Sequence, residues 1–178
     1  FFDLMRLIAQ SEPLKVYASG NQDVNHLNES YDGMVPDILD NAFVIVDFEN
    51  GVRAFLDLCM FAENSEFQEE LCAVGTLGKV ETEVPSNKSG IASSDIRIGL
   101  REITPALKET IAVDPKILEA GNHHGSTYYE HQSFINAIRN NTKPEVSLND
   151  GLIAVAIGEA AEISIKEGRV VQMSEFNL

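Results

Sequence analysis

This chain of 178 residues has no tryptophan, only two cysteines and no long apolar run. Two cysteines, Cys59 and Cys72, are too few for a disulfide scaffold, and their apolar surroundings predict buried, reduced thiols. No stretch approaches the roughly 18 apolar residues that a membrane span needs, and the first residues lack the basic segment of a secretory signal. These absences favour a cytoplasmic protein that does not act in a membrane.

Positive charge is also scarce, because 13 Lys and Arg stand against 28 Asp and Glu, for a formal net charge of -15. Nucleic acids and anionic membrane surfaces both require clustered cations, so neither is expected as a partner. A hydrophobic content of 44% is typical of a globular protein. We therefore expect residues 1–178 to form a single domain. Phe1, Phe2, Met5 and Ile8 are typical of an amphipathic helix that starts upstream, which predicts a piece of a longer polypeptide.

The sequence lacks the common motifs of a self-sufficient enzyme. Gly75-Thr-Leu-Gly78 is only G-x-x-G, lies between two predicted strands and leads to no helix, so it is interpreted as a turn and not as a dinucleotide site. No P-loop and no G-x-S-x-G motif is present. We therefore expect neither catalytic residues nor a cofactor site in this chain.

Alternation of apolar and polar residues predicts several strands. The clearest is a hairpin in which residues 42–48 and 52–61 flank Asn50-Gly51, a dipeptide typical of tight turns. Further strands are predicted at residues 15–18, 69–74, 79–84 and 95–100, with irregular segments at 20–40, 85–94 and 105–119. Strands followed by helices indicate the α+β class, with an open, mainly antiparallel β-sheet and helices packed on one face.

The two faces of this sheet differ. Residues of one parity are apolar enough to support helices, whereas the opposite face mixes charged residues with Phe43, Phe55 and Phe61. A solvated face is one explanation for this mixture. A subunit interface or a ligand wall is the other, since exposed phenylalanines are unfavourable in water.

Residues 121–171 predict two helices joined by a turn that contains Pro144. In the first helix, Thr127 and Glu130 have the spacing of a capping box. Its apolar face is predicted to lie against the core and consists of Tyr128, His131, Phe134, Ile135 and Ile138.

The second helix has a capping box at Ser147 and Asp150. It ends near Lys166 and Gly168, and a final strand is predicted near residues 170–173. Its predicted core stripe consists of Ile153, Ala156, Ile157, Ala160 and Ala161.

The histidines of residues 123–131 are candidates for ligand binding. His123, His124 and Glu130 resemble a metal set, but Thr127 stands where H-x-x-E-H requires histidine and no further ligands are apparent, so no metal is predicted. A loop of His, Asn and Tyr before a helix can bind hydroxyls or an anion; an ordinary surface loop is the alternative. The substrate-binding candidates are His123, His124 and Tyr128, with Asn122 and Tyr129 as weaker ones. His26 is expected to be exposed.

Several segments, in their order and spacing, resemble the C-terminal domain of the Gfo/Idh/MocA oxidoreductases, the family that includes glucose–fructose oxidoreductase and inositol dehydrogenase. The matching segments are FDLMR at 2–6, VDFENGVR at 46–53, VGTLGKV at 74–80, HGSTYYEH at 124–131 and residues 146–169.

The resemblance implies an N-terminal Rossmann domain that binds NAD or NADP, and hydride transfer to or from a sugar, inositol or related polyol. It implies that this domain shapes the substrate pocket and forms a homo-oligomer through its exposed sheet face. The family's lysine of an E-K-P motif is absent, and its D-x-x-x-H histidine would fall immediately before Phe1. This chain alone is therefore expected to be inactive. A sugar-binding or scaffold member without turnover remains the alternative.

Overall fold

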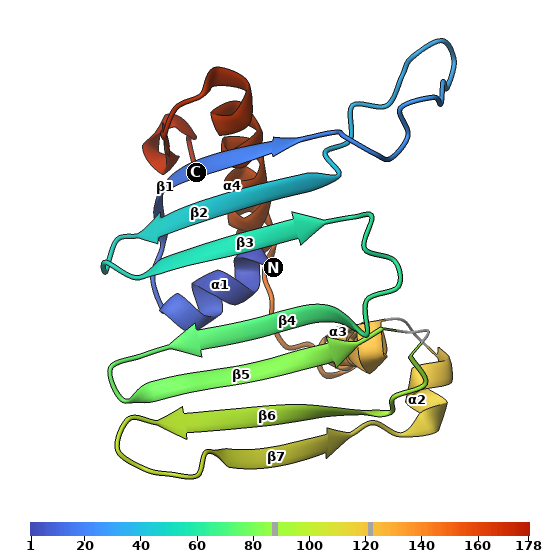
Figure 1. Cartoon of the computed structure of the whole chain (residues 1–178), viewed down its shortest axis with the longest axis vertical. Helices are drawn as coiled ribbons and strands as arrows, with labels where there is room; N and C mark the ends of the chain where they lie inside the picture. Colours follow the sequence, from blue (N-terminus) through green and yellow to red (C-terminus); the bar gives the residue numbers. More distant parts are fainter. Residues whose placement is uncertain (87–88, 121–122) are drawn as a thin grey trace. The chain divides into compact units, whose positions relative to one another are not determined.

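The computed structural model describes residues 1–86, 89–120 and 123–178, which fall into two compact units (Figure 1). The first unit comprises Phe1–Glu63 with Val146–Leu178, and the second comprises Asn64–Glu145. The described strands of each unit form one four-stranded antiparallel sheet, and each unit also contains helices. The α+β class and the antiparallel pairing are thus confirmed. Across the described ranges, no helix is both long and apolar enough to span a bilayer.

The first unit is a sheet with the strand order β3-β2-β1-β8 and two helices. Its elements are α1 (Phe2–Ala9), β1 (Pro13–Asn21), β2 (Asn41–Phe48), β3 (Arg53–Cys59), α4 (Leu148–Glu167), β8 (Val171–Gln172) and the 3₁₀ turn η2 (Met173–Glu175). The predicted hairpin is confirmed as β2 and β3, and its turn uses Gly51 at a φ of 86°. Strand β1 is longer at both ends than the predicted residues 15–18.

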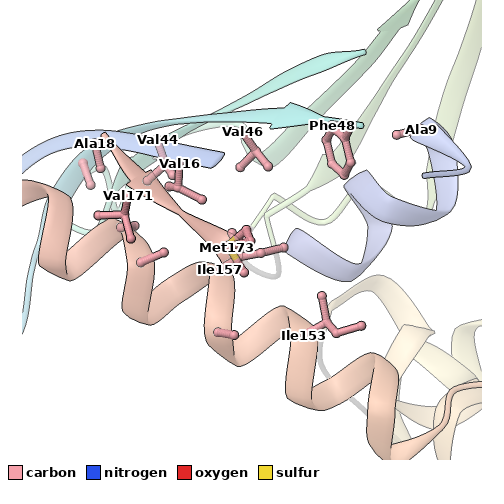
Figure 2. Packing of buried hydrophobic residues seen from close by; sticks show 14 residues of the cluster. Ala9, Val16, Ala18, Val44, Val46, Phe48, Ile153, Ile157, Val171 and Met173 are labelled. Carbon is pink, nitrogen blue, oxygen red and sulfur yellow. The ribbon is translucent and has the colours of Figure 1, made fainter. Parts of the chain in front are cut away.

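Alternation along β1 and β2 buries one side chain in two and creates the core of this unit. Val16, Val46 and Phe48 are at most 1% exposed; Val16 and Val46 face helix α4, and Phe48 lies beside helix α1 (Figure 2). Burying one such side chain contributes about 1.5–3 kcal/mol. The predicted stripe of α4 is confirmed, because all five of its members are buried: Ile153, Ala156, Ile157, Ala160 and Ala161.

Both predicted ends of α4 are also confirmed. The Ser147 hydroxyl accepts the Asp150 N–H at 3.2 Å, while the Asp150 carboxylate accepts the Ser147 N–H at 2.8 Å. Gly168 ends the helix in the left-handed region at a φ of 66°. These caps satisfy polar groups that a helix terminus otherwise leaves unpaired.

The second unit is a meander of four strands in the order β4-β5-β6-β7, followed by helices. Its elements are β4 (Phe67–Val74), β5 (Gly78–Pro85), β6 (Ser93–Leu100), β7 (Leu107–Ala112), α2 (Pro115–Ala120), the 3₁₀ turn η1 (His123–Gly125) and α3 (Ser126–Asn140). The prediction of an irregular segment at 105–119 is wrong, since β7 and α2 lie there. β7 is an exposed edge strand, so its sequence lacks the buried alternation that marks the other strands.

Helix α3 differs from its prediction in two ways. It begins at Ser126 after Gly125, and no side chain caps it, so the predicted capping box of Thr127 and Glu130 does not form. Its apolar stripe is exposed, whereas only Ala137 is buried. Periodicity shows that a helix face is apolar but does not identify what covers it.

The prediction of buried cysteines is wrong, because Cys59 and Cys72 are both exposed free thiols. In each strand the residue just before the cysteine, Leu58 or Leu71, points to the opposite face of the sheet and is half-buried. In a strand the face is set by parity, so an apolar context does not bury every residue within it.

Candidate functional site

The three predicted substrate-binding residues lie in the second unit, in and just after the turn η1. Three consecutive residues of this turn have a positive φ, namely His123 at 55°, His124 at 54° and Gly125 at 90°. A non-glycine residue in the left-handed region costs of order 1–3 kcal/mol, and such strain concentrates at binding sites. The backbone of η1 therefore supports the interpretation of this turn as a site.

Gly125 determines how the turn packs. A Cβ atom built on Gly125 would lie 2.9 Å from Ile117 Cγ2 and 3.2 Å from Val113 Cγ1. The glycine thus allows η1 to approach the start of α2 while also accepting the positive φ. The two histidines are consequently held at fixed backbone positions directly before helix α3.

The His123 ring faces strand β4. Its Nδ1 atom lies 3.2 Å from Gln68 Nε2 and 3.7 Å from Glu69 Oε1. The ladder between β4 and β5 shifts register between Phe67 and Glu69, which is an irregularity of the β-bulge kind. Bulges change the direction of neighbouring side chains, and here consecutive residues of β4 both reach the same histidine. Amide and carboxylate beside the imidazole form a polar group suited to ligand hydroxyls.

The His124 ring has an unsatisfied polar atom. Its Nε2 is buried and makes no hydrogen bond to any part of the chain that the structure describes. Leaving a buried polar atom without a partner costs about 1–3 kcal/mol. A polar partner at this nitrogen would remove that cost.

Tyr128 lies in the first turn of α3 and is 37% exposed. Its ring packs edge-to-face on Tyr129, with the centroids 5.7 Å apart. Its hydroxyl has one long contact, 3.5 Å from Gln132 Nε2. The hydroxyl is therefore free to exchange this contact for a ligand. Tyr129 is more exposed, at 52%, and Asn122 lies outside the described residues.

No group of three His, Cys, Asp or Glu side chains within the described ranges is arranged to hold a metal ion. His131 was expected to pack in the helix face, but it is exposed and its Nδ1 lies 2.8 Å from the Thr127 carbonyl oxygen. His26 is exposed, as predicted. Gly75 and Gly78 form the turn between β4 and β5, as predicted, which does not fit the strand–turn–helix of a dinucleotide site.

The sequence did not indicate every residue of this site. Gln68 and Glu69 are 55 and 54 positions from His123, and only the fold brings them to it. The His-His-Gly tripeptide before a helix was the available signal for the left-handed turn, because a glycine N-cap tolerates a positive φ.

Comparison with known proteins supports the same reading of the fold. The family model for the C-terminal alpha/beta domain of the Gfo/Idh/MocA oxidoreductase family matches residues 1–173. No curated protein sequence matches this chain.

Solved structures of oxidoreductases share the fold at low sequence identity. An oxidoreductase of Agrobacterium radiobacter, in complex with NAD+, L-tartaric acid and magnesium, superposes at a TM-score of 0.68 and 19% identity over 98% of this chain and 47% of its own. The aldose–aldose oxidoreductase of Caulobacter crescentus, complexed with glycerol, gives 0.65 and 20% over 96% of this chain and 44% of its own. An oxidoreductase domain protein of Kribbella flavida gives 0.68 and 17% over 97% and 49%. The chain thus spans less than half the length of these proteins.

Proposed function

The chain belongs to the Gfo/Idh/MocA oxidoreductase family, whose C-terminal alpha/beta domain it matches over residues 1–173, and we propose from this premise a substrate-binding role. Specifically, it serves as the substrate-binding and oligomerisation domain of an NAD(P)-dependent oxidoreductase. The reaction is hydride transfer between the nicotinamide and a carbon of a sugar, inositol or related polyol. The family match is the observation that carries this proposal.

The ligands seen in two of the similar structures support a polyhydroxylated substrate. Glycerol and L-tartaric acid, bound by the Caulobacter and Agrobacterium proteins, both carry hydroxyls on adjacent carbons. The Tyr128 hydroxyl is open to such a hydroxyl, and Nε2 of His124, which is buried without a partner among the described residues, bonds a second one once the atoms that cover it are displaced. His123, with its ring beside Gln68, adds a third polar position. These side chains bind and orient the substrate in this proposal.

The nicotinamide supplies or accepts the hydride when it is bound. The Gly75–Gly78 turn does not fit the strand–turn–helix of a dinucleotide site. In this proposal a separate domain of the full-length protein therefore binds the cofactor. Hydride transfer requires the reacting carbon to be held close to the cofactor. The task of this chain's residues in this proposal is to hold the polyol.

The outward face of the first unit's sheet is the proposed oligomer interface. Tyr17, Ile45 and Phe55 pair directly across three strands, and Phe43 lies in the adjacent row. These four side chains are 45–63% exposed. A contiguous apolar patch on one face of a sheet is typical of a protein–protein interface. The alternative of a purely solvated face gives no reason for aromatic residues at these positions.

Turnover by the full-length protein tests this function. The purified protein is supplied with NAD+ or NADP+ and a panel of sugars and polyols, and nicotinamide absorbance is followed. We expect reduction with at least one polyol, and His124→Ala is expected to raise its KM about tenfold, as one lost hydrogen bond predicts. His131→Ala is the matched control, because that ring bonds its own helix backbone.

Two results would contradict the proposal. If polyols bind but neither cofactor is reduced, the protein is a sugar-binding member without turnover. If the His124→Ala and His131→Ala variants have the same KM, the substrate lies elsewhere than at η1, even where turnover is observed.

A further inference from the structure

Residues 22–39, which we call the arm, connect β1 to β2 and carry an unusual amount of exposed apolar surface. Figure 1 shows the arm projecting past the ends of these two strands. Six large apolar side chains of the arm are 49–71% exposed: Val24, Leu27, Tyr31, Met34, Val35 and Ile38. Connections this long without regular structure are uncommon and are usually functional or disordered. The hydrogen bonds of the arm favour the functional explanation.

The base of the arm is fixed by Asp40, which is 1% exposed. Its carboxylate accepts the backbone N–H groups of Asp23, Val24 and Asn25 at 2.7–3.1 Å. Desolvation raises the pKa of this carboxyl, but the N–H donors lower it more, so the pKa lies well below its ordinary value. Asp40 is consequently ionised at neutral pH and holds the first residues of the arm.

The tip of the arm is also ordered by hydrogen bonds. Tyr31 and Met34 exchange two backbone hydrogen bonds, of 2.8 and 2.9 Å, around a turn. The Glu29 carboxylate lies 2.7 Å from His26 Nδ1 and accepts the Tyr31 hydroxyl at 2.8 Å. The arm thus presents its apolar side chains on a preorganised loop, which lowers the entropic cost of docking.

Charge restricts what the arm can contact. Its acidic residues are Asp23, Glu29, Asp32 and Asp37, and it contains no lysine or arginine. An acidic loop is repelled by anionic lipid surfaces and by nucleic acids, so a protein is the fitting partner. Asp32 and Asp37 make no hydrogen bond or ion pair within the described part of the chain, so both carboxylates are available to external cations.

The complementary cations lie on the outward face of the same sheet, at its other end. Lys15, Asp47 and Arg53 pair across β1, β2 and β3 in one row. Lys15 bonds Asp47 at 3.2 Å, whereas exposed Arg53 has no ion pair with any residue that the structure describes. The arm departs at Asn21, six residues further along β1, which is about 20 Å at the rise of a strand.

We propose that the arm of one copy lies across the Lys15–Arg53 row of a second copy. The row of Tyr17, Ile45 and Phe55 lies between the arm and the Lys15–Arg53 row. A two-fold axis through this apolar row would bring the arm of each copy to the Lys15–Arg53 row of the other, so that the same contact would form twice. Arg53, the cation of this row that has no ion pair among the described residues, is thus the counter-charge for the partner's arm, next to the apolar side chains of the face. This inference rests on the proposed oligomerisation through the sheet face, and it adds that the arm specifies the partner and its orientation.

Charge reversal and its rescue test the arm contact in the full-length protein. Sedimentation equilibrium gives the dimer Kd of Arg53→Glu, of Asp32→Lys combined with Asp37→Lys, and of all three substitutions together. We expect each reversal to raise Kd about tenfold and the combination to return it to within about threefold of the natural protein. Lys116→Glu, an exposed reversal in the second unit, is the matched control and is expected to leave Kd unchanged.

The outcomes separate the arm from the interface as a whole. Phe55→Glu places a charge in the apolar row and is expected to dissociate the dimer. If Phe55→Glu dissociates it while the arm reversals have no effect, or the triple variant is not rescued, the arm inference is wrong and the interface stands. If the protein is monomeric, or Phe55→Glu leaves the dimer intact, the sheet-face interface and the arm contact are both refuted.

Discussion

The guanidinium of Arg6 in helix α1 donates a hydrogen bond to the Asp150 carboxylate in the first turn of α4, with 3.2 Å between Nη1 and Oδ1. The same guanidinium bonds Glu12 through two nitrogens, at 2.8 and 3.1 Å, and Asp3 at 3.2 Å. Its side chain is only 10% exposed. The Arg6 guanidinium therefore joins helices α1 and α4 through two residues that are 144 positions apart in the sequence.

Replacing this arginine should destabilise the first unit. In Arg6→Ala, three carboxylates lose their common partner, and we expect the free energy of unfolding to fall by about 2 kcal/mol. Urea denaturation followed by circular dichroism measures the change. Arg139→Ala is the control, because Arg139 is exposed in the last turn of α3. Equal midpoints for the two variants would show that the Arg6 bonds do not stabilise the fold.

Acid should weaken the fold in a defined window. Hydrogen bonds from Ser147 and then from Arg6 lower the pKa of Asp150 from 3.8 to about 2, and bonding to Arg169 lowers the pKa of Glu175 from 4.5 to about 2. In the unfolded chain both carboxyls bind protons at higher pH than in the folded one. Their contribution is therefore complete above about pH 4.5 and is lost as the pH falls to about 2.

Urea midpoints at pH 5, 4 and 3 measure this loss. Asp150→Asn removes one of the two carboxyls, so the dependence on pH should become shallower. Glu159→Gln, at an exposed position of the same helix, should leave it as steep as in the natural sequence. An Asp150→Asn protein with an unchanged slope would contradict the assignment.

Strand β8 pairs with β1 only at Lys15 and Val16, and beyond them the Ser164 side chain bonds the β1 backbone. Its hydroxyl oxygen accepts the Ala18 N–H at 2.9 Å, the hydroxyl donates to the Arg169 carbonyl at 2.6 Å, and the residue is 0% exposed. Ser164→Ala leaves both backbone groups without this partner, and we expect a loss of about 1–3 kcal/mol in the free energy of unfolding. Hydrogen exchange of the Ala18 amide should accelerate in this variant.

The matched control is Ser174→Ala, at an exposed serine of η2 in the same unit. It removes a hydroxyl from the surface, so its midpoint should stay near that of the natural sequence. If Ser164→Ala behaves like this control, the hydroxyl is dispensable to the edge of the sheet.

Local signals in the sequence predicted much of the first unit. Asn50-Gly51 located the hairpin because a turn dipeptide acts over a few residues, and Ser147 with Asp150 located the start of α4 for the same reason. The stripe of α4 was found because burial repeats with the helical period. Such patterns depend only on neighbours in the chain.

Contacts between distant residues were not predictable in this way. Asp40 and the N–H groups of residues 23–25, or Arg6 and Asp150, meet only after the sheet has formed. The same holds for Gln68 beside His123 in the candidate site. The turn η1 was found as a loop of polar residues, but its three positive φ values follow from packing that a single sequence does not show.

Gly125 offers the sharpest test that the candidate site depends on this packing. In Gly125→Ala, the new Cβ would meet Ile117 Cγ2 at 2.9 Å, at a φ of 90° that disfavours any side chain. We expect a loss of about 2–4 kcal/mol in the free energy of unfolding of the second unit. Because η1 carries both histidines, we also expect a higher KM for the proposed polyol substrate in the full-length protein, even where the variant remains folded.

Gly151→Ala is the control that the chain itself provides. Gly151 lies in the first turns of α4, and nothing lies within 4 Å of the position that its Cβ would take. Alanine favours a helix over glycine by about 1 kcal/mol, so this variant should be as stable as the natural sequence or more so, with the same KM. If the two glycine variants have equal stability and equal KM, the left-handed turn is not what holds His123 and His124 in position. A loss of stability without a change in KM would place the substrate away from η1.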